Sequence, residues 1–147
     1  MPVNDGFHPE RVRKSFDKQR VMATIGAVLD AVTPGEVTIS MPPNAALTQQ
    51  HGYLQAGIIA TIADSACGCA ALSLMPEDAA VLSIEFKTNM LAPADGTRFI
   101  ARGRVIKPGR TIMVCDATVH AVRDEGEKLV ATMTGTMMVI KGRGISD

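Results

Sequence analysis

One acidic residue, Asp64, stands alone in a run of small and apolar residues. No other charged side chain occurs between Ala56 and Met75, and this composition is typical of a helix that is packed on nearly all sides. A buried carboxylate is costly unless it is paired or hydrogen-bonded. Either a nearby hydroxyl such as Thr61 or Ser65 satisfies it, or it is held at a cleft as a general base or nucleophile. We favour the second interpretation.

The start of the same predicted helix offers a second chemical group. A helix over about 55–74 begins at Gln55, Ala56 and Gly57, and the first backbone N–H groups of a helix lack partners within it. These groups favour negative charge and can polarise a carbonyl. Ala56 lies about 12 Å from Asp64 along a helix axis, which is too far for one carbonyl to meet both. We therefore expect composite sites across a homodimer interface.

Periodicity and turns predict the elements that must position these groups. A short charged helix is expected at about 8–18, with Pro9 at its start, and we expect its apolar side to cap the pocket. Strand-forming segments are predicted at 21–32, 36–41, 82–90, 97–107, 111–122 and 128–140. The tail over 141–147 is expected to be loose.

This order of elements indicates one α+β domain over residues 1–147. Strands and helices do not alternate, which excludes a doubly wound parallel sheet. Short turns between the late strands predict antiparallel neighbours. Such a six-stranded sheet needs an apolar partner, and the long helix is the only large one. We therefore expect an antiparallel six-stranded sheet wrapped around one long central helix.

Composition narrows the partners. Lysine and arginine total 15, as do aspartate and glutamate, so nothing favours nucleic acid or an anionic membrane surface. Asp64 near the middle of the apolar run argues against a membrane span. The three cysteines, Cys67, Cys69 and Cys115, suit buried free thiols in a reducing compartment. No signal peptide is visible, so a cytoplasmic location is the default. No cluster has metal-ligand spacing, so we expect no metal.

Three segments together resemble a known family. They are Ile59–Ala66, the strand Ser-Ile-Glu-Phe-Lys-Thr-Asn at 83–89, and the turn Leu-Ala-Pro-Ala-Asp-Gly at 91–96. In this order they resemble the hotdog-fold thioesterases of the PaaI (phenylacetyl-CoA thioesterase) type, over roughly residues 35–140. The resemblance implies a hotdog fold and an acyl-CoA thioesterase that hydrolyses a small or medium acyl-CoA.

The resemblance also implies roles for single residues. Asp64 falls on the catalytic acid, which activates water or attacks directly, and Ala56 and Gly57 fall on the glycines whose backbone N–H polarises the carbonyl. Gln55 stands where the family prefers histidine. The substrate-contacting positions fall on Gln49 and, for a serine that helps to orient water, on Ser83. His51 either lines the pocket or holds its loop.

The implied substrate is a coenzyme A thioester, with coenzyme A as part of the substrate and no separate cofactor. Lys107 and Arg110 belong to a basic turn that either binds its phosphates or is an ordinary solvated hairpin tip. The expected assembly is a homodimer, and further a dimer of dimers. Two alternatives to the acyl-CoA thioesterase activity remain. One is a non-catalytic acyl- or CoA-binding hotdog protein, which Gln55 favours. The other is a hotdog hydratase or dehydratase, whose Asp and His pair is not visible.

Overall fold

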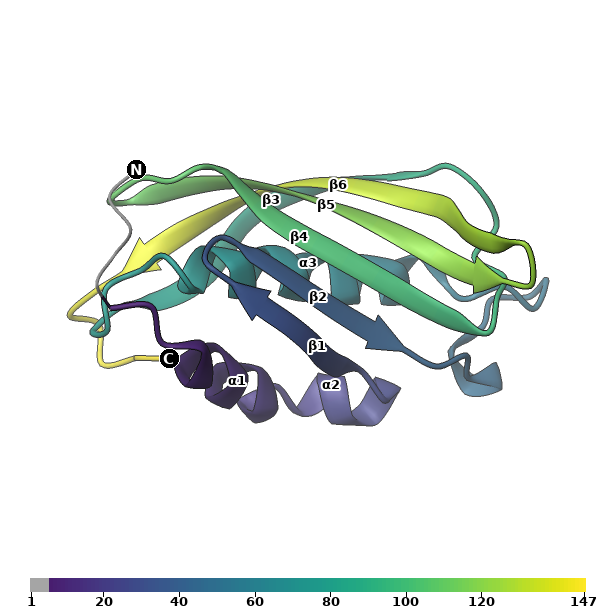
Figure 1. Cartoon of the computed structure of the whole chain (residues 1–147), viewed down its shortest axis with the longest axis horizontal. Coiled ribbons are helices and arrows are strands. Elements are labelled where there is room, and N and C mark those ends of the chain that lie inside the picture. The colour runs from purple at the N-terminus through teal and green to yellow at the C-terminus, as the bar shows by residue number, and fades with distance from the viewer. Residues whose placement is uncertain (1–5) are drawn as a thin grey trace.

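A curved antiparallel sheet wraps around one long helix in the computed structural model, which describes residues 6–147 (Figure 1). The helices are α1 (Pro9–Lys18), α2 (Arg20–Ile25) and α3 (Ala56–Leu72), with a short 3-10 turn at Ala45–Leu47. The strands are β1 (Val28–Thr33), β2 (Glu36–Met41), β3 (Ala80–Met90), β4 (Arg98–Lys107), β5 (Ile112–Arg123) and β6 (Gly126–Ile140). They pair in the order β1-β2-β4-β5-β6-β3. The expected α+β architecture is confirmed, and residues 1–5 of the predicted domain lie outside the described part.

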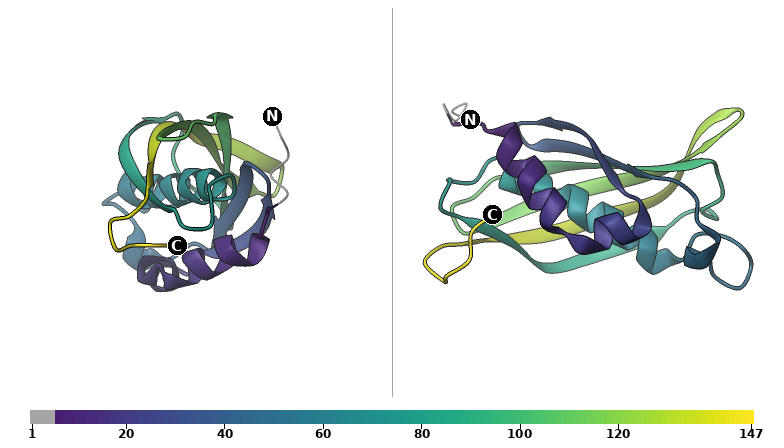
Figure 2. Two further views of the ribbon diagram at one scale, coloured as in Figure 1. Left: turned by 90° about the vertical axis from the view of Figure 1, so that its left-hand side faces the viewer. Right: turned by 90° about the horizontal axis from the view of Figure 1, so that it is seen from below.

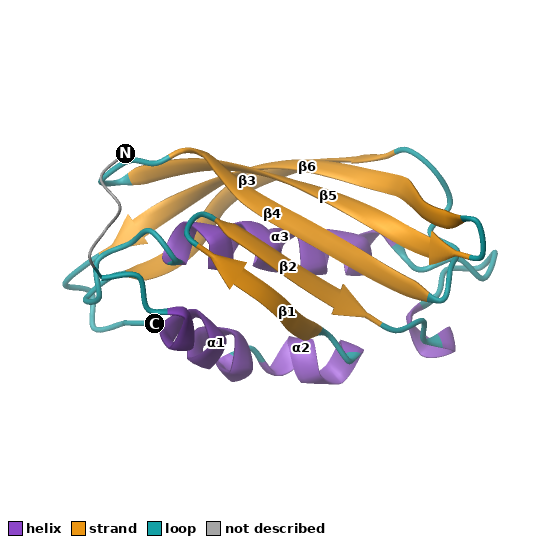
Figure 3. Cartoon of the chain, in the orientation of Figure 1, coloured by secondary structure: helices purple, strands orange, loops and turns teal. Residues whose placement is uncertain are grey.

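The helix α3 lies inside the curve of the sheet (Figure 3). Its large apolar side chains, Ile59 and Ile62, are fully buried, and so are Ala66 and Ala70. Small side chains let the sheet come close. At Gly103 on β4, a methyl group would overlap the backbone of Ala66 and lie 2.7 Å from the backbone nitrogen of Cys67. The position of Asp64 is therefore fixed by direct packing between helix and sheet.

The first expected strand is partly wrong. Residues Arg20–Ile25 form α2, and the strand β1 begins only at Val28. The helix buries Met22 and Ile25, three residues apart on one face, against the core. It ends at Gly26, whose φ of 72° is left-handed; such a glycine is a common helix C-cap. β-branched residues in this segment suggested a strand, but core packing of one helical face outweighed their propensity.

The C-terminal tail is also better fixed than expected. The Asp147 carboxylate accepts a hydrogen bond from the backbone N–H of Val81 at 2.7 Å and one from the Ser15 hydroxyl at 3.1 Å. Arg11 donates to the backbone oxygen of Asp147 at 3.3 Å. The end of the tail therefore lies beside α1 and the start of β3, as two views agree (Figure 2).

The strand β3 exposes several large apolar side chains. Leu82, Ile84 and Phe86 are each about half exposed, and β3 is an edge strand paired on one side only, with β6. The opposite edge, β1, is accompanied by α1. Within residues 6–147, no helix combines the length and apolar character needed to cross a bilayer.

Candidate active site

Asp64 and Ser83 meet across the gap between α3 and β3. The Ser83 hydroxyl donates a hydrogen bond of 2.7 Å to one carboxylate oxygen of Asp64. The carboxylate is only partly buried in the single chain, which corrects the expectation of a buried acid. The neighbouring hydroxyls serve other groups, since Thr61 donates to the oxygen of Gly57 and Ser65 to the side chain of Gln19.

The surroundings of Asp64 favour its protonated form. Partial burial raises the pKa of Asp64 above its ordinary value, and the hydrogen bond from Ser83 lowers this pKa by a smaller amount. Loss of hydration penalises the carboxylate, whereas a donated hydrogen bond stabilises it. A carboxylate whose pKa is raised toward neutrality is a better proton acceptor than an ordinary aspartate. The raised pKa therefore makes Asp64 a candidate general base.

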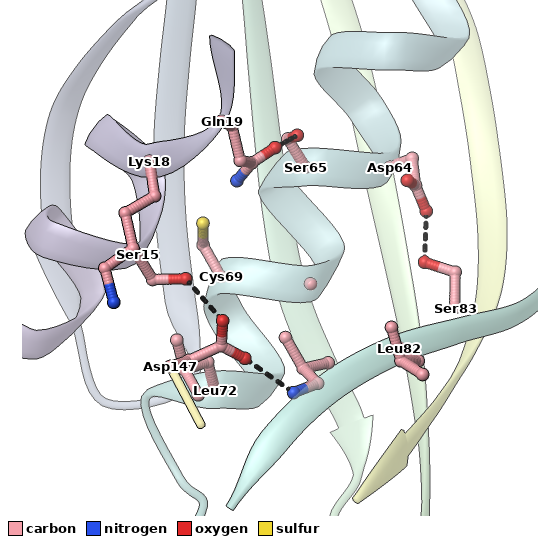
Figure 4. Close-up of a pocket in the computed structure, with 12 residues that line it drawn as sticks. Ser15, Lys18, Gln19, Asp64, Ser65, Cys69, Leu72, Leu82, Ser83 and Asp147 are labelled. Carbon is pink, nitrogen blue, oxygen red and sulfur yellow. Dashed lines mark hydrogen bonds between the residues drawn. The ribbon is translucent and has the colours of Figure 1, made fainter. Parts of the chain in front are cut away.

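A pocket of about 290 Å³ opens beside this pair (Figure 4). Besides Asp64 and Ser83, it is lined by residues from α1, α3, β3 and the tail: Ser15, Lys18, Gln19, Ser65, Gly68, Cys69, Leu72, Val81, Leu82 and Asp147. The expected cap by the apolar side of α1 is wrong, because Val12 and Phe16 pack in the core and its polar side lines the pocket. These polar residues were not predicted from the sequence, although the place of Lys18 on the polar side of α1 was a usable signal.

The start of α3 differs from the expected pair of free donors. The Gln55 side-chain oxygen accepts a hydrogen bond from the backbone N–H of Gly57 at 2.6 Å, so Gln55 caps the helix. The Gly57 donor is therefore engaged, contrary to its expected role. The N–H of Ala56 has no hydrogen-bond partner within residues 6–147, which leaves it as the accessible donor at this end.

A second cavity, of about 400 Å³, lies at this helix start and is lined by Gln49, Ala56, Met90 and Leu91 among others. The Gln49 side-chain oxygen accepts hydrogen bonds from the backbone N–H groups of His51, at 2.6 Å, and of Tyr53, at 3.2 Å. Gln49 thus holds the loop at the cavity rim. The His51 side chain is exposed.

The basic turn lies at the other end of the molecule. Lys107 and Arg110 are exposed between β4 and β5. Gly35 links this end to the end of α3, because its N–H donates to the Ser73 hydroxyl at 2.8 Å and its oxygen accepts from the N–H of Val105. Within one chain, Asp64 therefore contacts Ser83, and Gln49 and Ala56 line one cavity. Lys107 and Arg110 lie far from the start of α3.

The thiols are unsuited to nucleophilic chemistry. Cys67, Cys69 and Cys115 are free and buried, and burial raises the pKa of each thiol above its ordinary value. A thiol that resists ionisation is a poor nucleophile. Within residues 6–147, no three histidine, cysteine or carboxylate side chains gather in a way that could hold a metal ion.

A family model described as "Thioesterase superfamily" matches residues 51–128, which is more than half of the chain. The chain belongs to the thioesterase superfamily. The match begins in the loop before α3 and extends into β6, so it contains Asp64, Ser83 and the helix start. Membership makes the protein a thioester hydrolase, and the expected family is confirmed.

Solved structures that are similar to this thioesterase superfamily protein share its fold. A thioesterase family protein from Silicibacter pomeroyi is 55% identical, with a TM-score of 0.90, and the match covers 93% of this chain and all of that one. A thioesterase from Staphylococcus aureus is 25% identical over 82% of this chain and 98% of its own, with a TM-score of 0.76. The PaaI protein of the E. coli phenylacetic acid degradation operon is 19% identical, with a TM-score of 0.80, over 90% of this chain and 93% of its own. The hotdog fold is thereby confirmed.

Proposed function

We propose that this thioester hydrolase is an acyl-CoA thioesterase that acts on small or medium acyl-CoA substrates. Asp64 serves as general base or nucleophile, and the N–H of Ala56 holds the carbonyl oxygen. The observation that carries the proposal is the hydrogen-bonded pair of Asp64 and Ser83, 2.7 Å apart, at the wall of a pocket. The superfamily supplies the class of bond that is broken.

The chemistry needs two groups on opposite sides of one carbonyl. As a base, Asp64 takes a proton from water while the water oxygen bonds to the carbonyl carbon. The oxyanion that forms is stabilised by the N–H of Ala56, which also feels the positive end of the α3 dipole. Collapse breaks the C–S bond, and the thiolate leaves with the proton returned from Asp64. If Asp64 attacks the carbonyl carbon directly, the Ala56 N–H stabilises the same oxyanion and the CoA thiolate leaves. Water then cleaves the anhydride that joins the acyl group to Asp64.

A two-fold dimer through β3 would bring these groups together. Ser83, which contacts Asp64, lies near the start of β3, whereas Met90 at its end lines the cavity of the helix start. When two such edge strands pair antiparallel about a two-fold axis, the start of one faces the end of the other. Each acid then faces the partner's helix start. The same pairing brings Lys107 and Arg110 toward the partner's helix start, where CoA phosphates would need cations.

The direct test is release of free thiol from a panel of acyl-CoAs. Asp64→Asn keeps the shape of the side chain and can still accept from Ser83, but it cannot take a proton. We expect its turnover to fall by at least about a hundredfold, the usual contribution of a general base. Equal turnover by wild type and Asp64→Asn would contradict the assigned role.

Complementation tests the shared site. Ala56→Pro removes the N–H at the first helical position, where proline is well tolerated, and Gln55 already has φ −65° and ψ 140°, which suits a residue before proline. Each variant alone should be inactive. Refolding equal amounts of Ala56→Pro and Asp64→Asn together should restore about a quarter of wild-type activity, because half of the dimers then hold one intact site. No recovery would place both groups in one chain.

One observation favours a binding protein without turnover. Gln55 engages the Gly57 N–H at 2.6 Å and so leaves fewer donors for an oxyanion. Tight binding of acyl-CoA by calorimetry, with no thiol release at micromolar protein, would support this alternative.

The cellular location, the assembly and the cofactor are also part of the proposal. Free buried cysteines agree with a reducing compartment, so we propose a cytoplasmic location. We also propose a dimer of dimers and no cofactor apart from the coenzyme A of the substrate.

A further inference from the structure

The pocket beside Asp64 has two unlike walls (Figure 4). One is apolar and comes from α3 and β3, with Gly68, Leu72, Val81 and Leu82. The other is polar and comes from α1, the residue that follows it and the tail, with Ser15, Lys18, Gln19 and Asp147. A pocket for a plain hydrocarbon chain would gain nothing from amide and charged groups, whose desolvation is costly. The polar wall therefore points to a ligand that carries its own polar group.

Gln19 presents a donor next to the acid. Its side-chain oxygen accepts the Ser65 hydroxyl at 2.7 Å, and Ser65 follows Asp64 directly in α3. The amide nitrogen points away from Ser65 (Figure 4) and has no hydrogen-bond partner within residues 6–147. An amide nitrogen only donates. A ligand in the pocket would therefore satisfy it with an acceptor oxygen near the reacting carbonyl.

Lys18 presents a second donor further along the wall. Its side chain extends toward Ser15 in Figure 4, and its ammonium makes no ion pair within the described chain. Each oxygen of the nearby Asp147 carboxylate already accepts one hydrogen bond, from the Ser15 hydroxyl and from the Val81 N–H. The charges around the pocket are thus Lys18 and the adjoining Arg11 against Asp64 and Asp147. The open groups on this wall are donors.

We propose that this pocket selects acyl groups that carry an acceptor oxygen on the chain, with Gln19 and Lys18 as specificity-determining residues. The inference rests on the proposed acyl-CoA function and names its substrate class. An oxygen close to the thioester, as in a β-hydroxyacyl group, meets the Gln19 amide. An oxygen at the far end, as in an ω-carboxyacyl group, meets the Lys18 ammonium. The apolar wall receives the carbon chain in both cases.

Matched substrates test the proposal. β-Hydroxybutyryl-CoA is compared with butyryl-CoA, and glutaryl-CoA with valeryl-CoA, by kcat/KM. We expect at least one oxygenated member to be preferred by about tenfold, the value of one good hydrogen bond in a pocket. Gln19→Met keeps the length of the side chain but removes the amide, so it should abolish a β-hydroxy preference. Lys18→Met keeps chain length and should abolish a carboxylate preference. Lys14→Met, on the same helix but at a different cavity, should change neither ratio.

Binding separates this inference from the proposed function. The Kd of each substrate pair is measured by calorimetry with Asp64→Asn protein, which needs no turnover. A tenfold binding preference, together with no thiol release by the wild-type protein, would sustain the inference and contradict the catalytic proposal. Hydrolysis of all four substrates with equal kcat/KM and equal Kd would do the reverse. A preference that survives both Gln19→Met and Lys18→Met would overturn the assignment to these residues.

Discussion

At the scale of single residues, two opposing effects set the pKa of Asp64. Partial burial raises the pKa of Asp64, and the hydroxyl of Ser83 restrains that rise. The two effects oppose each other because dehydration favours the neutral carboxyl and the donated hydrogen bond favours the carboxylate. The Ser83 hydroxyl therefore contacts Asp64 directly and lowers the pKa of its carboxyl relative to burial alone.

Ser83→Ala should shift the acid limb of the pH–rate profile to higher pH. Without the donor, nothing offsets burial, so the pKa of Asp64 rises further and the ionised form appears only at higher pH. The effect should be visible in kcat/KM measured from acidic to neutral pH, with a loss of rate of about tenfold on the acid side.

Ser83→Thr is the matched control for that shift, because it keeps the hydroxyl on a β-branched side chain that suits a strand. Its acid limb should stay near that of wild type. A shift in the opposite direction for Ser83→Ala would mean that Ser83 stabilises the neutral form of the carboxyl, contrary to the donor role in this structure.

At the scale of elements, the small-residue composition of α3 is a packing requirement. β4 crosses the helix at Gly103, where the backbones of Ala66 and Cys67 leave no room for a side chain. A larger residue on either surface would move the helix away from the sheet, and Asp64 would move away from Ser83. Composition and site geometry are thus linked through one close approach.

Gly103→Ala should destabilise the protein by about 2 kcal/mol, because overpacking against rigid backbone forces a shift of the helix. Chemical denaturation gives the free energy of unfolding. Gly68→Ala is the control, since a methyl group there meets nothing within 4 Å and alanine is the better helix former by roughly 0.5–1 kcal/mol. Equal effects of the two changes would show that this close approach is not a constraint.

At the scale of the whole molecule, the β3 edge is unlike the rest of the surface. An edge strand with unpaired backbone groups and exposed Leu82, Ile84 and Phe86 is a template for pairing with another chain. Natural proteins protect such edges or use them. The two half-sites at its ends explain how this enzyme would use the edge: pairing would complete the active site.

In the proposed dimer, Ile84→Lys should give a monomer and reduce activity together with it, because a charge replaces apolar contact at the pairing edge. Light scattering after size exclusion gives the mass. Ile106→Lys is the control, because Ile84 and Ile106 are equally exposed, at 54%, but Ile106 lies on β4, which is flanked by β2 and β5. A dimer that persists in Ile84→Lys would exclude β3 as the interface.

The sequence by itself predicted most of the elements and singled out Asp64 as the one charged residue of the long helix. A long apolar helix with one charge and strands of period two can be recognised locally, because side-chain period follows backbone geometry. The α2 helix was missed because core burial of Met22 and Ile25, a tertiary effect, outweighed local propensity.

Only the tertiary structure decided the partners of those residues. Asp64 accepts a hydrogen bond from Ser83, which is 19 positions away in the chain. Gln19 and Asp147, which are far apart in the sequence, line the same pocket. No local pattern encodes such contacts, since they depend on how helix and sheet pack. The capping of the Gly57 N–H by Gln55 likewise depends on the side-chain rotamer, which the sequence does not specify.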